Sequence, residues 1–132
     1  MVWTLVSICV LMLAWVACDA MQDTVAYHYD TSVFRNAKHR RWLDPSISWK
    51  NKWKDGDAGK GERFFGSSTF LVWLTDFWHF MKAVKIALLW SALGVALSCW
   101  VIALVGTVAH GIVFECVFRV LGNTRINNNS NS

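Results

Sequence analysis

Proline and N-terminal positive charge are the two things this sequence most lacks. It has a single proline, so little in it enforces a break in a long helix. Its first 34 residues contain no lysine or arginine, whereas a secretory signal peptide normally begins with a positively charged region. A cleaved signal peptide is therefore disfavoured for the apolar start of the chain.

Metal-binding and disulfide spacings are missing as well. The four cysteines lie inside apolar runs and form no C-x-x-C pair. Such cysteines usually behave as small buried apolar residues, so neither a disulfide framework nor a zinc ribbon is expected. No H-E-x-x-H motif is present, and the glycines near residue 59 lack the spacing of a phosphate-binding loop.

What the sequence has is apolar surface, strongly segregated from charge. Hydrophobic residues make up 55% of the chain, the mean hydropathy is +0.32, and nine of the 13 Lys and Arg lie between Arg35 and Arg63. The flanking regions 1–29 and 67–121 are overwhelmingly apolar. A charge inside hydrocarbon costs about 2.5–3.5 kcal/mol even on insertion scales. This segregation predicts an all-α integral membrane protein, a three-helix bundle with one N-terminal span and a C-terminal hairpin.

Residues 1–32 are interpreted as the first membrane helix with a cytoplasmic extension. Asp19, Asp23 and Tyr27 recur every four residues, so helical periodicity continues past any cleavage site. Two alternatives stay open: cleavage after a signal peptide, and lipidation at Cys18. Retention of the helix is favoured over both.

Residues 67–121 are long enough for two spans of about 20 residues each. A turn near 91–94 gives two balanced helices, and residues whose numbers add to about 186 then face each other. Asp76 would lie level with His110, and both helices would be apolar in their outer halves. The alternative, one helix from residue 67 to 105, would leave a final span that is short for a bilayer.

The basic loop sets the expected orientation. Cations near the inner ends of spans stay in the cytoplasm, so loop 33–66 and the C-terminus are predicted inside and the N-terminus outside, in a bacterial inner membrane. The polar tail 122–132 is Asn-rich and is predicted to be disordered.

Tryptophan alternates with lysine and arginine in the loop. Indole rings and cations together suit the headgroup region of a membrane, and this is favoured over stacking on nucleic acid because both ends of the loop continue into spans. The residues predicted to bind the membrane surface are Arg40, Arg41, Trp42, Trp49, Lys50, Lys52 and Trp53.

Ionisable residues inside apolar segments are functional candidates, since they persist despite the cost of desolvation. The candidates are Asp23, His28, Asp76, His79, His110 and Glu115. Asp76 and His79 are three residues apart and therefore share a helix face. Imidazole with carboxylate suits a divalent transition metal, whose bound water would attack an ester or amide. A network of structural hydrogen bonds and a proton or ion relay are the other interpretations, and the structural network is favoured.

Three segments resemble a family of small bacterial and phage multi-pass membrane proteins without an assigned activity: Ser48–Trp53 (SWKNKW), Phe64–Phe80 (FFGSSTFLVWLTDFWHF) and Phe114–Leu121 (FECVFRVL). The resemblance implies three helices, a Thr-Asp-x-x-His element at Thr75–His79, and Asp23 with His28 as matching positions, but no activity. The expected function is a structural or interaction protein that associates with the bilayer, with itself or with a membrane partner. A metal-dependent membrane hydrolase and a holin-like permeabilising protein are the alternatives.

Overall fold

The computed structural model describes the backbone of residues 1–129 and the side chains of residues 1–114, 116 and 117. The described chain is helical and contains no β-strand. Its only bridge between extended residues joins Trp53 and Glu62. The predicted all-helical class is confirmed.

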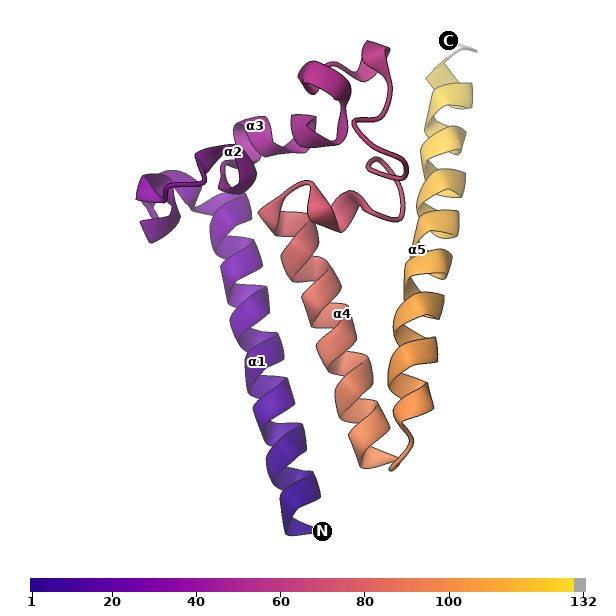
Figure 1. Cartoon of the computed structure of the whole chain (residues 1–132). Helices are drawn as coiled ribbons and strands as arrows, with labels where there is room; N and C mark the ends of the chain where they lie inside the picture. Colours follow the sequence, from indigo (N-terminus) through magenta and orange to yellow (C-terminus); the bar gives the residue numbers. More distant parts are fainter. Residues whose placement is uncertain (130–132) are drawn as a thin grey trace.

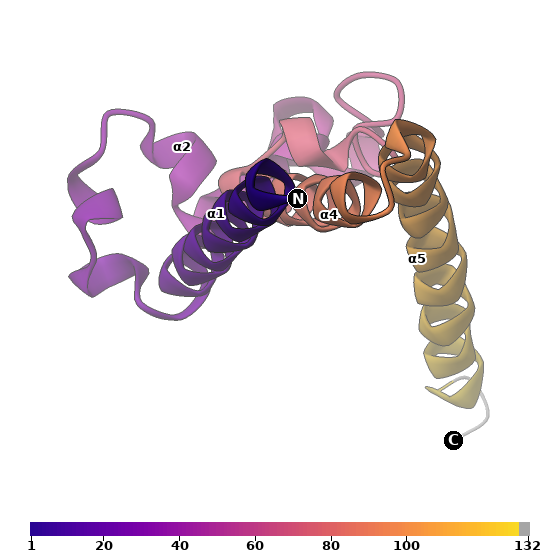
Figure 2. The ribbon, with the colours of Figure 1, turned by 90° about the horizontal axis from the view of Figure 1, so that it is seen from below.

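Three long helices form a row (Figures 1 and 2). They are α1 (Val2–Tyr27), α4 (Phe77–Ala96) and α5 (Trp100–Asn129). Helix α4 runs opposite to the other two and packs against both, whereas α1 and α5 share no comparable interface within the described residues. The arrangement is therefore an open layer centred on α4, not a closed bundle.

Two of these helices are long and apolar enough to cross a membrane. At 1.5 Å per residue, α1 is about 39 Å long and α4 about 30 Å, against a hydrocarbon core of about 30 Å. The apolar part of α5 that is described, Trp100–Phe114, is shorter than a span. Length and composition thus support two membrane-crossing helices.

The interface between α1 and α4 follows a coiled-coil spacing. Among the half-buried and buried residues of α1, one series, which continues to Tyr29 just beyond its end, recurs at alternating steps of three and four: Ile8, Leu11, Trp15, Cys18, Gln22, Val25 and Tyr29. Such a seam lets side chains of one helix fit between those of the next at a small crossing angle. On α4 the seam is met by Phe77, Met81, Val84 and Leu88, which join the main apolar core.

The turn between α4 and α5 lies later in the chain than predicted. Helix α4 continues through residues 91–94, and the chain turns at Leu97–Cys99, with Ser98 in the left-handed region at φ 51°. Gly94 does not break the helix because its bare face receives the start of α5: a Cβ there would lie 3.1 Å from the Cys99 carbonyl oxygen. The glycine allows close packing where the sequence indicated a turn.

This later turn changes which residues face each other across the hairpin. The Lys82 ammonium lies 3.3 Å from the centre of the Phe114 ring, and Trp90 lies against Gly106. Both pairs have numbers adding to 196, ten more than predicted. Asp76 is consequently not level with His110.

Other boundaries also differ from the predicted ones. Helix α1 ends at Tyr27 instead of continuing to residue 32, because His28 leaves the helical region with φ −131°. Residues 67–76 form turns, so α4 begins only at Phe77. Residues 122–129 continue α5, where a disordered tail was expected; residues 130–132 lie outside the described part.

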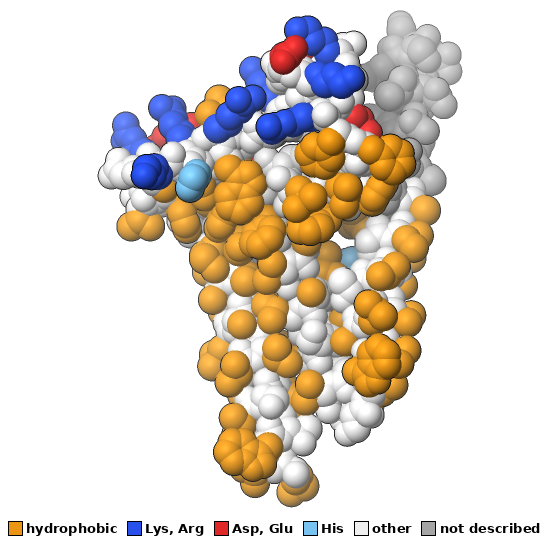
Figure 3. Space-filling view, in the orientation of Figure 1, with side chains coloured by type: hydrophobic (Ala, Val, Ile, Leu, Met, Phe, Trp, Pro, Cys, Tyr) orange, Lys and Arg blue, Asp and Glu red, His pale blue; other side chains and the backbone are white. Residues whose placement is uncertain are grey.

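Residues 28–76, called here the cap segment, cross the ends of α1 and α4 (Figure 1). Its short helices are η1 (Tyr29–Thr31), η2 (Val33–Asn36), α2 (Arg40–Leu43), α3 (Pro45–Ser48), η3 (Trp49–Lys52), η4 (Lys54–Gly56), η5 (Ala58–Lys60) and η6 (Val72–Leu74). Phe34 and Trp42 anchor it on α4, each with its ring centre 5.4 Å from that of Phe77. Lysine and arginine side chains gather on this segment, and apolar side chains cover the helices on the face shown in Figure 3.

Candidate functional site

Asp76 fixes the start of α4. Its backbone is extended, and its Oδ1 accepts a hydrogen bond of 2.9 Å from the backbone N–H of His79. An aspartate in this position satisfies a donor that the first helical turn leaves without a partner. The Thr75 hydroxyl donates to Oδ2 over 3.1 Å, and only 2% of Asp76 is exposed. Helix capping therefore places a carboxylate in a buried position.

The same carboxylate orients the His79 ring. Nδ1 of His79 lies 2.7 Å from Oδ2 and 2.9 Å from Oδ1 of Asp76. An ionised carboxylate only accepts hydrogen bonds, so Nδ1 is the donor in the pair, and in the neutral imidazole Nε2 keeps its lone pair. The His79 side chain is 29% exposed. An imidazole held in this way is suited to accept a proton or bind a metal through Nε2.

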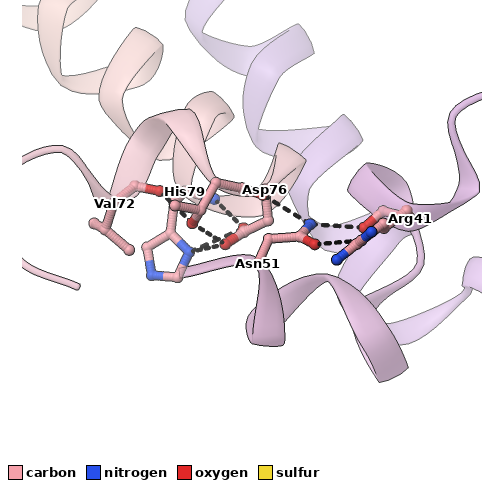
Figure 4. A network of polar contacts seen from close by, with 6 residues as sticks. Arg41, Asn51, Val72, Asp76 and His79 are labelled. Carbon is pink, nitrogen blue, oxygen red and sulfur yellow. Dashed lines mark hydrogen bonds and ion pairs between the residues drawn. The ribbon is translucent and has the colours of Figure 1, made fainter. Parts of the chain in front are cut away.

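Asn51 ties the cap segment to this point (Figure 4). Its side-chain amide donates to the Thr75 carbonyl over 3.0 Å and to the Arg41 carbonyl over 2.8 Å. The Arg41 guanidinium returns a hydrogen bond of 3.1 Å to Oδ1 of Asn51. Arg41, Asn51, Thr75, Asp76 and His79 together form what we call the polar network. Because Asn51 is buried, each of its bonds is costly to lose.

An ion pair joins α1 to α4 farther along the helices. The Lys85 ammonium donates to Oδ1 of Asp19, and the Trp15 ring centre lies 5.5 Å from the same ammonium. Each partner lies eight residues, or about 12 Å, from the end of its helix next to the cap segment. Lys82, on the α5 side of α4, lies over Phe114. The predicted site did not include Asp19 or Lys85.

A second buried carboxylate shapes the cap segment. Asp44 precedes α3 and accepts hydrogen bonds from the backbone N–H and the hydroxyl of Ser46, at 2.9 and 2.6 Å. The Arg40 guanidinium adds a bond of 3.0 Å. These bonds, those from Ser46 first, hold the pKa of Asp44 below its ordinary value, although burial opposes the shift. Glu62 acts similarly as an acceptor for the backbone N–H groups of Gly66 and Ser68.

The six predicted metal-site residues are spread over the molecule. Asp76 and His79 are in contact, whereas Asp23 is exposed on α1 and His28 is exposed just beyond it. His110 is half-buried on α5, and the Glu115 side chain lies outside the described residues. Among the described residues, no group of three or more His, Cys, Asp or Glu is placed to hold a metal ion. The metal site stays a prediction, with one pair of its residues in place.

The predicted membrane-surface residues divide into two sets. Trp42 lies in the core against Phe77 and Phe80, and Arg40 and Arg41 are bound to Asp44 and Asn51. Those nearer α4 in sequence form two cation–aromatic pairs, with Lys50 over the exposed Trp49 and Lys52 over the half-buried Trp53. Exposed aromatic side chains follow in Phe64, Phe65, Phe70 and Trp73, a set that the sequence-based prediction omitted.

Comparison with protein-family models, with curated proteins and with solved structures finds no match.

Proposed function

We propose that this chain is a multi-pass membrane protein with a structural, non-enzymatic role, in which α1, α4 and α5 cross the bilayer. In this proposal the cap segment lies on the cytoplasmic face and the N-terminus and the α4–α5 turn lie outside. The protein holds a fixed pair of helices, α1 and α4, for association with lipid, with a second copy or with another membrane protein.

The observation that carries this proposal is the position of charge. Basic side chains gather on the cap segment, and the two cations along α4, Lys82 and Lys85, each have a specific contact. In hydrocarbon, helix ends and charges must be satisfied within the protein. The Asp19–Lys85 pair and the aromatic contacts of Lys82 meet that requirement, whereas a soluble protein would gain little by it.

Cysteine labelling tests the topology. In a cysteine-free background, Ser98→Cys reports on the α4–α5 turn and Ser46→Cys reports on the cap segment; both positions are exposed. In bacterial spheroplasts, a membrane-impermeant maleimide should label the first variant directly and the second only after permeabilisation. The reverse pattern would overturn the orientation, and recovery of the unlabelled protein in the soluble fraction would overturn the membrane proposal.

The structural role has its own test. Asp76→Ala removes the cap of α4 and the partner of His79, so self-association measured by cross-linking in lipid nanodiscs should be lost. Asp23→Ala, an exposed carboxylate on α1, is the control and should leave association unchanged. A wild-type protein that is monomeric and binds no partner would contradict the role in association.

One observation favours a second function, hydrolysis assisted by His79. The buried Asp76 leaves Nε2 of His79 as a base or metal ligand, the arrangement that orients imidazole in many catalytic sites. Elemental analysis of protein purified in mild detergent decides whether a stoichiometric transition metal is bound, and His79→Gln should abolish its retention. Metal retained equally by this variant would remove His79 from the proposal.

A further inference from the structure

A polar groove lies where α1 ends and the cap segment begins. It is lined by the chain from Ala26 to Thr31 on one side and by Arg40, Asp44, Pro45 and Ser46 on the other. If α1 crosses the bilayer, its final turn reaches the headgroup region, so this inference rests on the proposed function. A groove at that depth is within reach of phospholipid headgroups.

Tyr29, one of the residues that line the groove, carries a buried hydroxyl without a partner. Tyr29 is 93% buried, being 7% exposed, and its hydroxyl has no hydrogen-bond partner in the structure. A buried hydroxyl without a hydrogen bond is unfavourable, because it has given up its bonds to water and gained none in exchange. An acceptor atom supplied by a ligand would remove that cost.

The charges of the groove are mixed. The Arg40 guanidinium uses Nε for Asp44, and its side chain is 71% exposed, which leaves the remaining N–H groups facing solvent. The hydrogen bond and the charge of Asp44 raise the pKa of Arg40 above its ordinary value. The Asp44 carboxylate is already occupied by three hydrogen bonds, whereas that of Asp30 is exposed.

We propose that this groove binds the headgroup of a zwitterionic phospholipid that carries a primary ammonium. The phosphate lies at the Arg40 guanidinium and the Tyr29 hydroxyl, and the ammonium lies at the Asp30 carboxylate. Guanidinium groups bind phosphate through paired N–H donors, and a phosphate oxygen is a strong acceptor for a tyrosine hydroxyl. The carboxylate in the same groove disfavours a headgroup with only negative charge.

The test uses full-length protein in detergent and three probes: dihexanoyl phosphatidylethanolamine, dihexanoyl phosphatidylglycerol and inorganic phosphate. Binding is measured by calorimetry below the micelle concentration of the short-chain lipids. We expect the ethanolamine lipid to bind at least about tenfold more tightly than the other two, since one charge-assisted hydrogen bond contributes about 1.5–3 kcal/mol. Equal binding of inorganic phosphate would show a plain anion site, and equal binding of the glycerol lipid would remove the role of Asp30; either result overturns the proposal.

Variants separate the groups. Tyr29→Phe keeps the ring and removes only the hydroxyl, and Arg40→Gln removes the cation; each should weaken binding of the ethanolamine lipid about tenfold. Lys38→Gln is the matched control, an exposed cation two residues away with the same change in charge, and should change affinity less than twofold. Asp30→Asn should remove the preference over phosphatidylglycerol. Near-UV circular dichroism checks the fold of each variant, and unchanged binding by folded Tyr29→Phe and Arg40→Gln would overturn the site.

The cysteine-labelling experiment described for the topology distinguishes a failure of headgroup binding from a failure of the proposed function. If headgroup binding is absent while Ser98→Cys and Ser46→Cys still label from opposite sides, the groove proposal alone is wrong.

Discussion

Helix α4 meets its two neighbours in different ways. Toward α1 it presents large apolar side chains at coiled-coil spacing, and an ion pair between Lys85 and Asp19. Toward α5, each helix offers a glycine to the other: a Cβ on Gly106 of α5 would clash with the Trp90 ring of α4, and a Cβ on Gly94 of α4 would lie 3.2 Å from that of Ala103 on α5. The first interface is specified by side-chain volume and charge, the second by the absence of side chains. Substitutions that affect one should leave the other intact.

The largest effect is expected from loss of the ion pair. Asp19→Asn leaves the Lys85 ammonium without its partner in an apolar layer, which should lower the free energy of unfolding by about 3 kcal/mol. Unfolding in mixed micelles, followed by tryptophan fluorescence, measures the change. The double variant Asp19→Asn with Lys85→Met should recover most of the loss, because no charge is then left in the interface. Asp23→Asn is the matched control on the exposed side of α1 and should have little effect; an equal loss there would show that the pair itself does not matter.

The glycine interface should respond to a single methyl group. Gly106→Ala forces the Trp90 ring to move, and over-packing of this kind costs about 1–3 kcal/mol. Gly111→Ala, on the same helix, places its methyl group in open space and should be neutral or slightly stabilising. The same unfolding measurement compares the two. If both variants behave alike, close approach of α4 and α5 is not what specifies this interface.

A third substitution extends the comparison to the cap segment, which packs against the core between α1 and α4. Asn51→Ala leaves the Thr75 and Arg41 carbonyls without their donor. This should destabilise the contact between the cap segment and the start of α4 by about 1–2 kcal/mol. Limited proteolysis should then cut the cap segment faster while the α4–α5 hairpin stays protected. Asn36→Ala, at an exposed position of η2, is the control. Equal protection of the cap in both variants would contradict the role of Asn51.

The smallest effect is expected from pH. The pKa of Asp44 is lower in the folded protein than its ordinary value of about 3.9, so its stabilising contribution is complete above that value and is lost as the pH falls through the folded pKa. The loss should approach about 1 kcal/mol, as for other aspartates that cap a helix. Asp44→Asn should flatten this part of the stability profile between about pH 5 and 2. A variant with the same acid sensitivity as the wild type would assign the effect to other carboxylates.

The sequence allowed prediction of the parts that depend on local pattern. Uninterrupted apolar runs predicted helices, and the three-residue spacing of Asp76 and His79 predicted that they share a site. The hairpin turn was misplaced because it was predicted from the balance of polar and apolar residues between two helices, whereas Gly94 lies inside α4 and permits close packing there. Whether it does so depends on Ala103 and Cys99, which only the folded hairpin places opposite.

The Asp19–Lys85 pair was missed for a different reason. Its partners are 66 residues apart, and their meeting depends on the register between α1 and α4. The three-and-four spacing from Ile8 to Tyr29 is present in the sequence and would have placed Asp19 beside the seam. The spacing does not show where α4 begins. That starting point is set by Asp76 at the N-terminus of the helix and by Asn51, which donates to the Thr75 carbonyl.

The central position of α4 has a mechanical consequence. Within the described residues α1 and α5 share no interface comparable to those with α4, so a displacement of α5 would be passed to α1 mainly by a rotation or slide of α4. Lys82 and Lys85 lie three residues apart on α4 and face different neighbours, so any such rotation moves one ammonium away from its aromatic ring while it pulls the other from its carboxylate. The contacts of these two ammonium groups therefore fix the rotation of α4 about its axis, between two interfaces that are otherwise apolar.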